Sequence, residues 1–373
     1  SPPENTELRF PRREWRGSFR EYNQREGRWH YFAPVWHTGQ AVKALVMAHR
    51  LDDSHGYLEN AIQGAAFIRG NQITEGTNAG LILAYEGSPP ETVRLPGIPE
   101  CLDGIMLLAE ETEDDSLWQL AFDAVDWLLR RAYKPELHAI LNWYTPSEDR
   151  FEVYPHSVIP NAKPTLDGAV LPRAYWKSGR QVYKDAAVDL ADTLLEHEYP
   201  RGNWLRFGPS NLQTGQEHPR HAFWYGYPMI AMFDLTGDEK YLQQALRSAE
   251  WYMKAMRRDG GLFRGTFIDG NTNSFGHAAS GVGCAILFWA ELWERLRDER
   301  YLEYIKKGLT FLQQMQVQRA VDPNMQGTII EKIMPPDGTD RSPYLVRDLG
   351  SIFFVQAAAA ILGNHDLMRE LFP

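Results

Sequence analysis

The sequence predicts an all-α fold in which six helical hairpins close into an (α/α)6 barrel. An apolar helical segment is followed, after a short turn, by an amphipathic one, and this pair recurs six times. Inner helices of a ring are buried on all sides and outer helices on one side, which matches the two kinds of segment. The apolar members begin at intervals of 54 to 71 residues, marked by His37, Asp103, Asp167, His221, His277 and Asp348. Such a period indicates one repeated supersecondary unit, so we expect a single barrel over residues 1–373.

The first pair shows the pattern that the others repeat. Trp36–Leu51 carries apolar residues at helical spacing, Asp52-Asp53-Ser54-His55-Gly56 ends it, and amphipathic Tyr57–Asn71 follows. The later apolar segments are Cys101–Glu111, Leu166–Lys177, His221–Leu235, Phe275–Arg297 and Tyr344–Leu362. Their amphipathic partners are Asp114–Arg131, Gln181–Glu198, Lys240–Arg257, Glu299–Gln316 and the short Asp366–Phe372.

The long connectors all precede apolar helices, which places them on the face where the inner helices begin. Binding residues often lie on such loops. Within Leu137–Pro160 we expect a small β-hairpin over the cavity. Phe263–Ile268 and Gly327–Met334 are expected to add further short strands.

The composition narrows the class of partner. The formal net charge of -10 argues against nucleic acid or an anionic membrane as a partner. Cys101 and Cys284 are too few for a disulfide framework or a zinc site, so we expect buried thiols. No apolar run is long enough to cross a membrane, and the first residues do not resemble a signal peptide. We expect a bacterial cytoplasmic or periplasmic protein, and a secreted form with a removed signal stays open.

Two Leu-Asp-Gly triplets carry the strongest hint of chemistry. Asp103 and Asp167 each follow a Pro-containing loop at the start of an apolar segment, where free backbone N–H groups favour a carboxylate. On adjacent inner helices the two acids would face each other across a cavity, as acid–base work on a sugar requires. Each acid also fits the plainer interpretation of a helix cap.

The other polar residues at the inner-helix starts resemble a carbohydrate pocket, with aromatic rings for sugar faces and polar groups for hydroxyls. The expected substrate-binding residues are Trp36, His37, Gln40, Glu100, Arg173, His218, Arg220, His221, Trp224, His277, Arg347 and Asp348. The aromatic side chains equally suit a helical core. His221 and His277 are sugar ligands, proton-transfer groups or core histidines. Arg220 and Arg347 suit a substrate carboxylate, although Arg347 is better placed to pair with Asp348.

No dinucleotide, phosphate-loop, zinc-protease or serine-hydrolase motif occurs. We therefore expect no metal and no organic cofactor, and an oligosaccharide as the binding partner. The oligomeric state stays open.

Three patches resemble the six-hairpin glycosidase superfamily, and within it the unsaturated glucuronyl and rhamnogalacturonyl hydrolases (glycoside hydrolase families 88 and 105). They are the two Leu-Asp-Gly triplets and the segment Arg220–Tyr227, which continues to Leu235–Leu242 with its Thr-Gly-Asp turn. The resemblance implies that Asp167 is the general acid/base and that Asp103 assists it. It also implies an oligosaccharide substrate containing a uronic acid. Two features depart from the family pattern: His221 follows Arg220 where the family has Gly, and Pro172 interrupts the third inner helix.

We therefore expect a glycoside hydrolase. A sugar epimerase or a polysaccharide lyase on the same toroid remains the alternative, with His221, His277 or Tyr225 as the base. A non-catalytic glycan-binding module is the third possibility.

Overall fold

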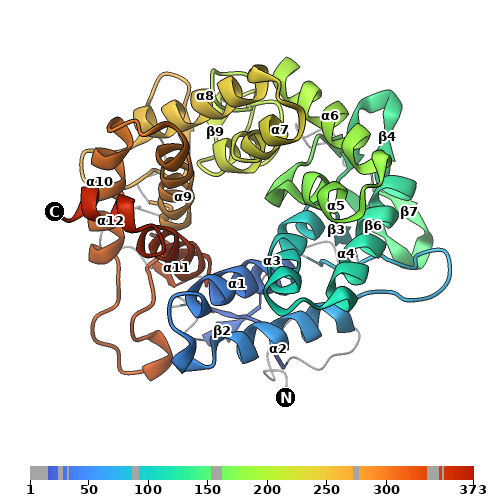
Figure 1. Ribbon diagram of the computed structural model, residues 1–373, viewed down its shortest axis with the longest axis horizontal. Helices are drawn as coiled ribbons and strands as arrows, with labels where there is room; N and C mark the ends of the chain where they lie inside the picture. Colours follow the sequence, from blue (N-terminus) through green and yellow to red (C-terminus); the bar gives the residue numbers. More distant parts are fainter. Residues whose placement is uncertain are drawn as a thin grey trace.

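The computed structural model describes residues 16–23, 28–31, 33–85, 92–152, 162–271, 277–333, 344–346 and 348–373. In this part of the chain twelve α-helices form two concentric rings (Figure 1). The inner helices are α1 (Pro34–His49), α3 (Gly97–Thr112), α5 (Val170–Ser178), α7 (Pro228–Thr236), α9 (Ala279–Leu296) and α11 (Asp348–Leu362). The outer helices are α2 (Tyr57–Gly70), α4 (Asp115–Trp127), α6 (Gln181–Glu196), α8 (Glu239–Ala255), α10 (Arg300–Gln314) and α12 (His365–Leu371). The predicted (α/α)6 barrel is confirmed.

Close packing of backbones joins the first two inner helices. A Cβ atom on Gly104 would lie 1.9 Å from the backbone oxygen of Gly39, and one on Gly39 would lie 2.4 Å from Cα of Cys101. Only glycine fits at such a crossing.

Cys101 and Cys284 are free and buried, as predicted.

The short turns between inner and outer helices follow from their sequence. Gly237 ends α7 with φ +71°, which glycine adopts without strain. Asp238 then caps α8, because its carboxylate accepts a hydrogen bond of 3.0 Å from the Lys240 amide. Asp114 caps α4 in the same way through the Ser116 amide at 2.7 Å. These local caps help α4 and α8 to return along their inner partners.

The ring closes between the first and last inner helices. The Gln356 side-chain amide on α11 donates a hydrogen bond of 2.9 Å to the backbone carbonyl of Gln40 on α1. His37 Nδ1 lies 2.8 Å from a carboxylate oxygen of Asp348, at the start of α11. These contacts connect residues more than 300 positions apart.

Short strands occupy the connectors. The strands are β1 (Glu21–Asn23), β2 (Arg28–His30), β3 (Val93–Arg94), β4 (Tyr133–Lys134), β5 (Ala139–Leu141), β6 (Trp143–Thr145), β7 (Arg150–Phe151), β8 (Ala162–Lys163), β9 (Gln216–Glu217), β10 (Thr266–Phe267), β11 (Lys332–Ile333) and β12 (Tyr344–Val346). They form four antiparallel sheets in the orders β11-β12-β1-β2, β10-β9, β3-β6-β7 and β4-β5-β8.

The predicted hairpin within Leu137–Pro160 is the pair β6 and β7. Its upstream part behaves differently, because β5 pairs with β4 and β8 and not with β6. Residues 153–160 of the predicted segment lie outside the described residues. The strands predicted within Phe263–Ile268 and Gly327–Met334 are present as β10 and β11.

Two inner helices differ in detail from the prediction. Pro172 does not interrupt the third one, because α5 begins at Val170 and Pro172 falls in its first turn, where a missing N–H removes no helical hydrogen bond. The fourth is divided into a π-helical turn, η6 (Ala222–Gly226), and α7, which starts at Pro228. No helix within the described ranges is long and apolar enough to cross a membrane.

We predict that Gly104→Ala destabilises the barrel by about 2–3 kcal/mol, because the added methyl group meets backbone and not a movable side chain. Urea unfolding of the purified variants measures this change. Gly70→Ala is the matched control: its Cβ would meet nothing within 4 Å at the end of α2, so stability should stay equal or rise by up to about 1 kcal/mol. Equal stability of the two variants would contradict the close crossing of α1 and α3.

Candidate active site

Asp167 lies at the start of the third inner helix, on a single 3-10 turn, η5 (Asp167–Ala169). Gly168 and Ala169 both have positive φ, which turns the chain sharply into α5. Gly168 also packs against the second acid, since a Cβ atom there would lie 2.5 Å from Cβ of Asp103. The two Leu-Asp-Gly triplets therefore meet, as their positions in the repeat predict.

The Asp167 carboxyl group is set up to hold a proton. It is 3% exposed, and neither oxygen has a hydrogen-bond partner among the described residues. Burial raises its pKa, and the negative charge of Glu100 raises it further, against the opposing charges of Lys163 and Arg94. The resulting pKa is about 8. Asp167 is therefore a neutral carboxylic acid at neutral pH.

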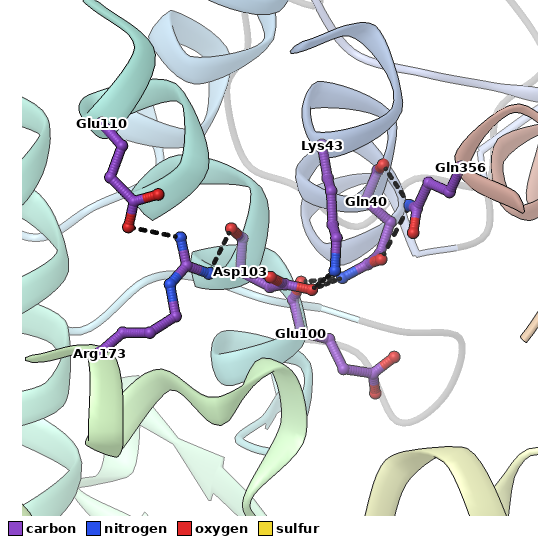
Figure 2. A network of polar contacts seen from close by, with 7 residues as sticks. All are labelled: Gln40, Lys43, Glu100, Asp103, Glu110, Arg173 and Gln356. Carbon is purple, nitrogen blue, oxygen red and sulfur yellow. Dashed lines mark hydrogen bonds and ion pairs between the residues drawn. The ribbon is translucent and has the colours of Figure 1, made fainter. Parts of the chain in front are cut away.

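Asp103 has the opposite environment. Lys43 Nζ lies 2.8 Å from one carboxylate oxygen and Arg173 Nη1 lies 2.9 Å from the other (Figure 2). Burial raises the pKa of Asp103, but the charges of Lys43 and Arg173 and hydrogen bonds from Lys43 and Gln40 outweigh it, so the net pKa is lowered. Asp103 is therefore ionised, and Lys43 and Arg173 balance its negative charge. It has no proton to donate at neutral pH.

The position predicted for Asp103 was also wrong. Helix α3 begins at Gly97, so Asp103 lies in its second turn and not at the rim. Glu100, one turn earlier, is the carboxylate whose charge acts on Asp167. In Figure 2 the Glu100 carboxyl group points away from the ion pairs of Asp103. The structure therefore pairs Asp167 electrostatically with Glu100, which the sequence suggested only as a sugar ligand.

His221 is neutral and fully buried. Its Nδ1 lies 3.0 Å from the carbonyl oxygen of Trp204 and 2.9 Å from Ser210 Oγ. Because a carbonyl only accepts, Nδ1 carries the proton and Nε2 keeps its lone pair. Burial and the charge of Lys163 lower the pKa of His221 to about 3. Within the described part of the chain, Nε2 has no hydrogen-bond partner.

Two of the three other predicted histidines, His277 and His37, hold elements together. His277 Nε2 is 2.9 Å from the Ile330 carbonyl oxygen, and its ring meets Phe311 edge-on, which fits the core interpretation. His37 pairs with Asp348 across the ring closure. Arg347, also predicted in the site, lies outside the described residues.

Trp36 and Trp224, which were predicted to stack on sugar rings, contact the Arg220 side chain. The guanidinium carbon of Arg220 lies 5.5 Å from the ring centre of Trp36 and 4.7 Å from that of Trp224. The ring of His218 stacks on Trp224 at 5.3 Å, with 3° between the planes. Both indoles are at least 95% buried. Protein side chains therefore cover most of both rings, although Trp224 also lines the cavity described below.

The sequence did not predict two residues of the site, Lys163 and Arg94, and it suggested Tyr225 only as a possible base. Lys163 lies at the end of β8 and Arg94 at the end of β3. The positive charge of each opposes the rise in the pKa of Asp167. Tyr225 is fully buried; burial raises its pKa, and the Asp167 charge raises it further. One signal was available: each cation lies a few residues before an inner-helix acid, Lys163 before Asp167 and Arg94 before Glu100.

A cavity of about 300 Å³ runs along the inside of the barrel, and both Asp167 and Glu100 line it. Gln40, Lys43, Asp103 and Arg173 also line it. A lining residue near the end of an inner helix is more exposed than the acids: Trp176 on α5 is 49% exposed and Asp167 is 3% exposed. The cavity therefore opens where the inner helices finish.

Comparisons with known proteins agree with this architecture. No protein-family model matches the chain, and no curated protein matches it in sequence. Cellobiose 2-epimerase from Bacillus thermoamylovorans B4167 has a similar structure (TM-score 0.68, 12% identity, covering 93% of this chain and 94% of the epimerase). So does unsaturated glucuronyl hydrolase from Bacillus sp. GL1 (TM-score 0.64, 16% identity, 89% and 87%). D-mannose isomerase gives a TM-score of 0.64 at 13% identity, covering 96% and 94%.

The fold is that of the six-hairpin toroid. These neighbours act on sugars by hydrolysis, epimerisation and isomerisation, as their names state. At such low identity the likeness establishes the fold and leaves the reaction to the site itself.

We predict opposite effects for the two aspartates in urea unfolding. Asp103→Asn should destabilise the protein by about 3 kcal/mol, because it leaves the buried charges of Lys43 and Arg173 without their partner.

Asp167 binds its proton more tightly in the folded protein than in the unfolded chain. Wild-type stability should therefore fall as the pH rises from about 4 to about 8. Asp167→Asn removes that fall and should gain on the wild type by at least about 1.4 kcal/mol across this window. A pH-independent difference between Asp167→Asn and wild type would contradict the raised pKa.

Proposed function

We propose that the protein is a glycoside hydrolase with Asp167 as its general acid and base. The observation that carries this proposal is the pKa of about 8 at a buried carboxyl group that lines a cavity. A general acid must hold its proton at the working pH and sit where water does not compete for it. Asp167 meets both conditions and Asp103 does not.

The proton transfers balance within this site. The Asp167 carboxyl group gives its proton to the glycosidic oxygen as the bond from that oxygen to the anomeric carbon breaks. The Asp167 carboxylate then takes a proton from the water that attacks the same carbon, which restores the starting acid. The negative charge of Glu100 stabilises the positive charge that develops on the sugar ring. Asp103 is a positioning residue in this scheme, since it packs against Gly168.

The cations around the acid favour a substrate that carries a carboxylate. Burial lowers the pKa of His218, and the positive charges of Arg220, Arg264 and Arg94 lower it further. Nη1 of Arg220 is buried without a hydrogen-bond partner among the described residues. A uronic acid would supply the missing acceptor through its carboxylate. In a protein of net charge -10, the buried and unpaired Nη1 of Arg220 supports an acidic sugar as the substrate.

A sugar epimerase or isomerase is the second candidate. The buried lone pair of His221 Nε2 favours it, since such enzymes need a base to remove a proton from carbon. The pKa of about 3 makes His221 a weak base, so we rank this candidate below hydrolysis. A lyase also needs a base that removes a proton from carbon. A non-catalytic binding module would not account for the raised pKa of Asp167.

We predict that Asp167→Asn lowers kcat at least about 1,000-fold on an oligosaccharide with a non-reducing uronic acid, while the fold is kept. The chemical step of the wild type should be constant near pH 6–7 and fall above a pKa of about 8, because only the protonated acid reacts. Single-turnover rates between pH 5 and 9, with circular dichroism of each variant, measure both effects. Unchanged turnover in Asp167→Asn would remove Asp167 from the mechanism.

The products separate the candidate reactions. A screen of saturated and unsaturated uronic-acid oligosaccharides, followed by mass and ultraviolet absorbance, should give new reducing ends with a gain of one water. An absorbing alkene would indicate a lyase, and a product of unchanged mass but altered sugar would indicate an epimerase or isomerase. Binding without any product would favour the non-catalytic module.

A further inference from the structure

The open end of the cavity is a second cluster of side chains that the proposed reaction does not use. Four inner helices each contribute one residue from near their C-terminal ends: Glu110 from α3, Trp176 from α5, Asp234 from α7 and Arg295 from α9. We call these four residues the far vestibule. Val170, at the start of α5, and Trp176 are six residues apart, or about 9 Å along the helix axis. The far vestibule is therefore a separate level of the cavity, closer to solvent than the acids.

Trp176 is the aromatic surface of the far vestibule. It is 49% exposed, and among the described residues no other tryptophan is classed as exposed. The buried rings of Trp36 and Trp224 contact Arg220 instead. An indole that is half exposed inside a concave site offers a flat apolar face, edged by polar groups, as sugar rings require.

The charged groups around Trp176 are paired with one another. Arg295 forms two hydrogen bonds of 2.8 Å with Asp234, and its Nε donates to Glu291 at 2.9 Å. Arg173 Nη2 lies 3.2 Å from Glu110, while its Nη1 bonds Asp103. These pairs leave no excess cation for an anionic ligand. Their remaining oxygens and N–H groups can still exchange hydrogen bonds with hydroxyls.

We propose that the far vestibule binds one ring of an uncharged saccharide, with the sugar face on Trp176 and the hydroxyls on the surrounding ion pairs. The cavity volume of about 300 Å³ is at the lower end of the range for small-ligand sites. The inference rests on the shape and charge of this end of the cavity and holds whether or not Asp167 catalyses hydrolysis.

Calorimetric titration of the full chain with D-mannose, cellobiose and D-glucuronate tests the proposal. At least one of the two neutral sugars should bind, with a Kd in the millimolar range, and D-glucuronate should not compete with it. Trp176→Ala should weaken this binding at least tenfold, and Trp176→Phe should keep part of it. Asp167→Asn should bind the neutral sugar as the wild type does, which separates this site from the proposed catalytic one.

Val182→Ala is the matched control, because Val182 is similarly exposed, at 48%, but lies on outer helix α6. Its binding should equal that of the wild type, and thermal unfolding of each variant checks the fold. The proposal is overturned if neither neutral sugar binds the wild type, or if Trp176→Ala binds it as tightly as wild type. It is also overturned if binding is lost in Asp167→Asn and retained in Trp176→Ala.

Discussion

The ion pairs of Asp103 with Lys43 and Arg173 join the first three inner helices in the middle of the barrel. Their strength depends on burial, because water no longer screens the charges. They fix the side chain against which Gly168 packs, and so they set the position of Asp167 on its 3-10 turn. Two identical residues in equivalent triplets thereby reach opposite protonation states within one cavity. Asp103 is ionised between two cations, whereas burial and the negative charge of Glu100 keep the proton on Asp167.

This difference of environment has a functional consequence. Acid–base enzymes carry out acid catalysis and base catalysis at one pH because neighbouring groups in their sites have different pKa values. Here burial and Glu100 raise the pKa of Asp167, while burial and Lys163 lower that of His221. The site thus offers a proton donor and a weak base, which suits protonation of a leaving group better than removal of a proton from carbon. The far vestibule adds a more exposed level, lined by paired charges and Trp176, to the same cavity.

The fold could be predicted almost completely because its signals are local. Helical periodicity, apolar against amphipathic segments, and turns such as Thr236-Gly237-Asp238 lie within each hairpin of the sequence. The boundaries were less certain where backbone geometry changes inside a segment. The π-helical turn before Pro228 and the left-handed Ala169 before α5 are examples.

The site could be predicted only in part, since the deciding charges come from distant segments. Glu100 and Asp103 are three residues apart on one helix, so their spacing does not separate their roles. Lys43 is 60 residues away from Asp103 and Arg173 is 70, and no local pattern records that they meet. The aromatic residues Trp36 and Trp224 were singled out for sugar stacking, but their contact with Arg220 depends on how the ring closes.

The protonation state of Asp167 is the central claim, and infrared difference spectroscopy of wild type minus Asp167→Asn measures it directly. Between pH 5 and 9 the account predicts a protonated carboxyl band at neutral pH that disappears with a midpoint near a pKa of about 8. A carboxylate band already complete at pH 6 would contradict it, because an Asp167 ionised at that pH has no proton to give to a substrate.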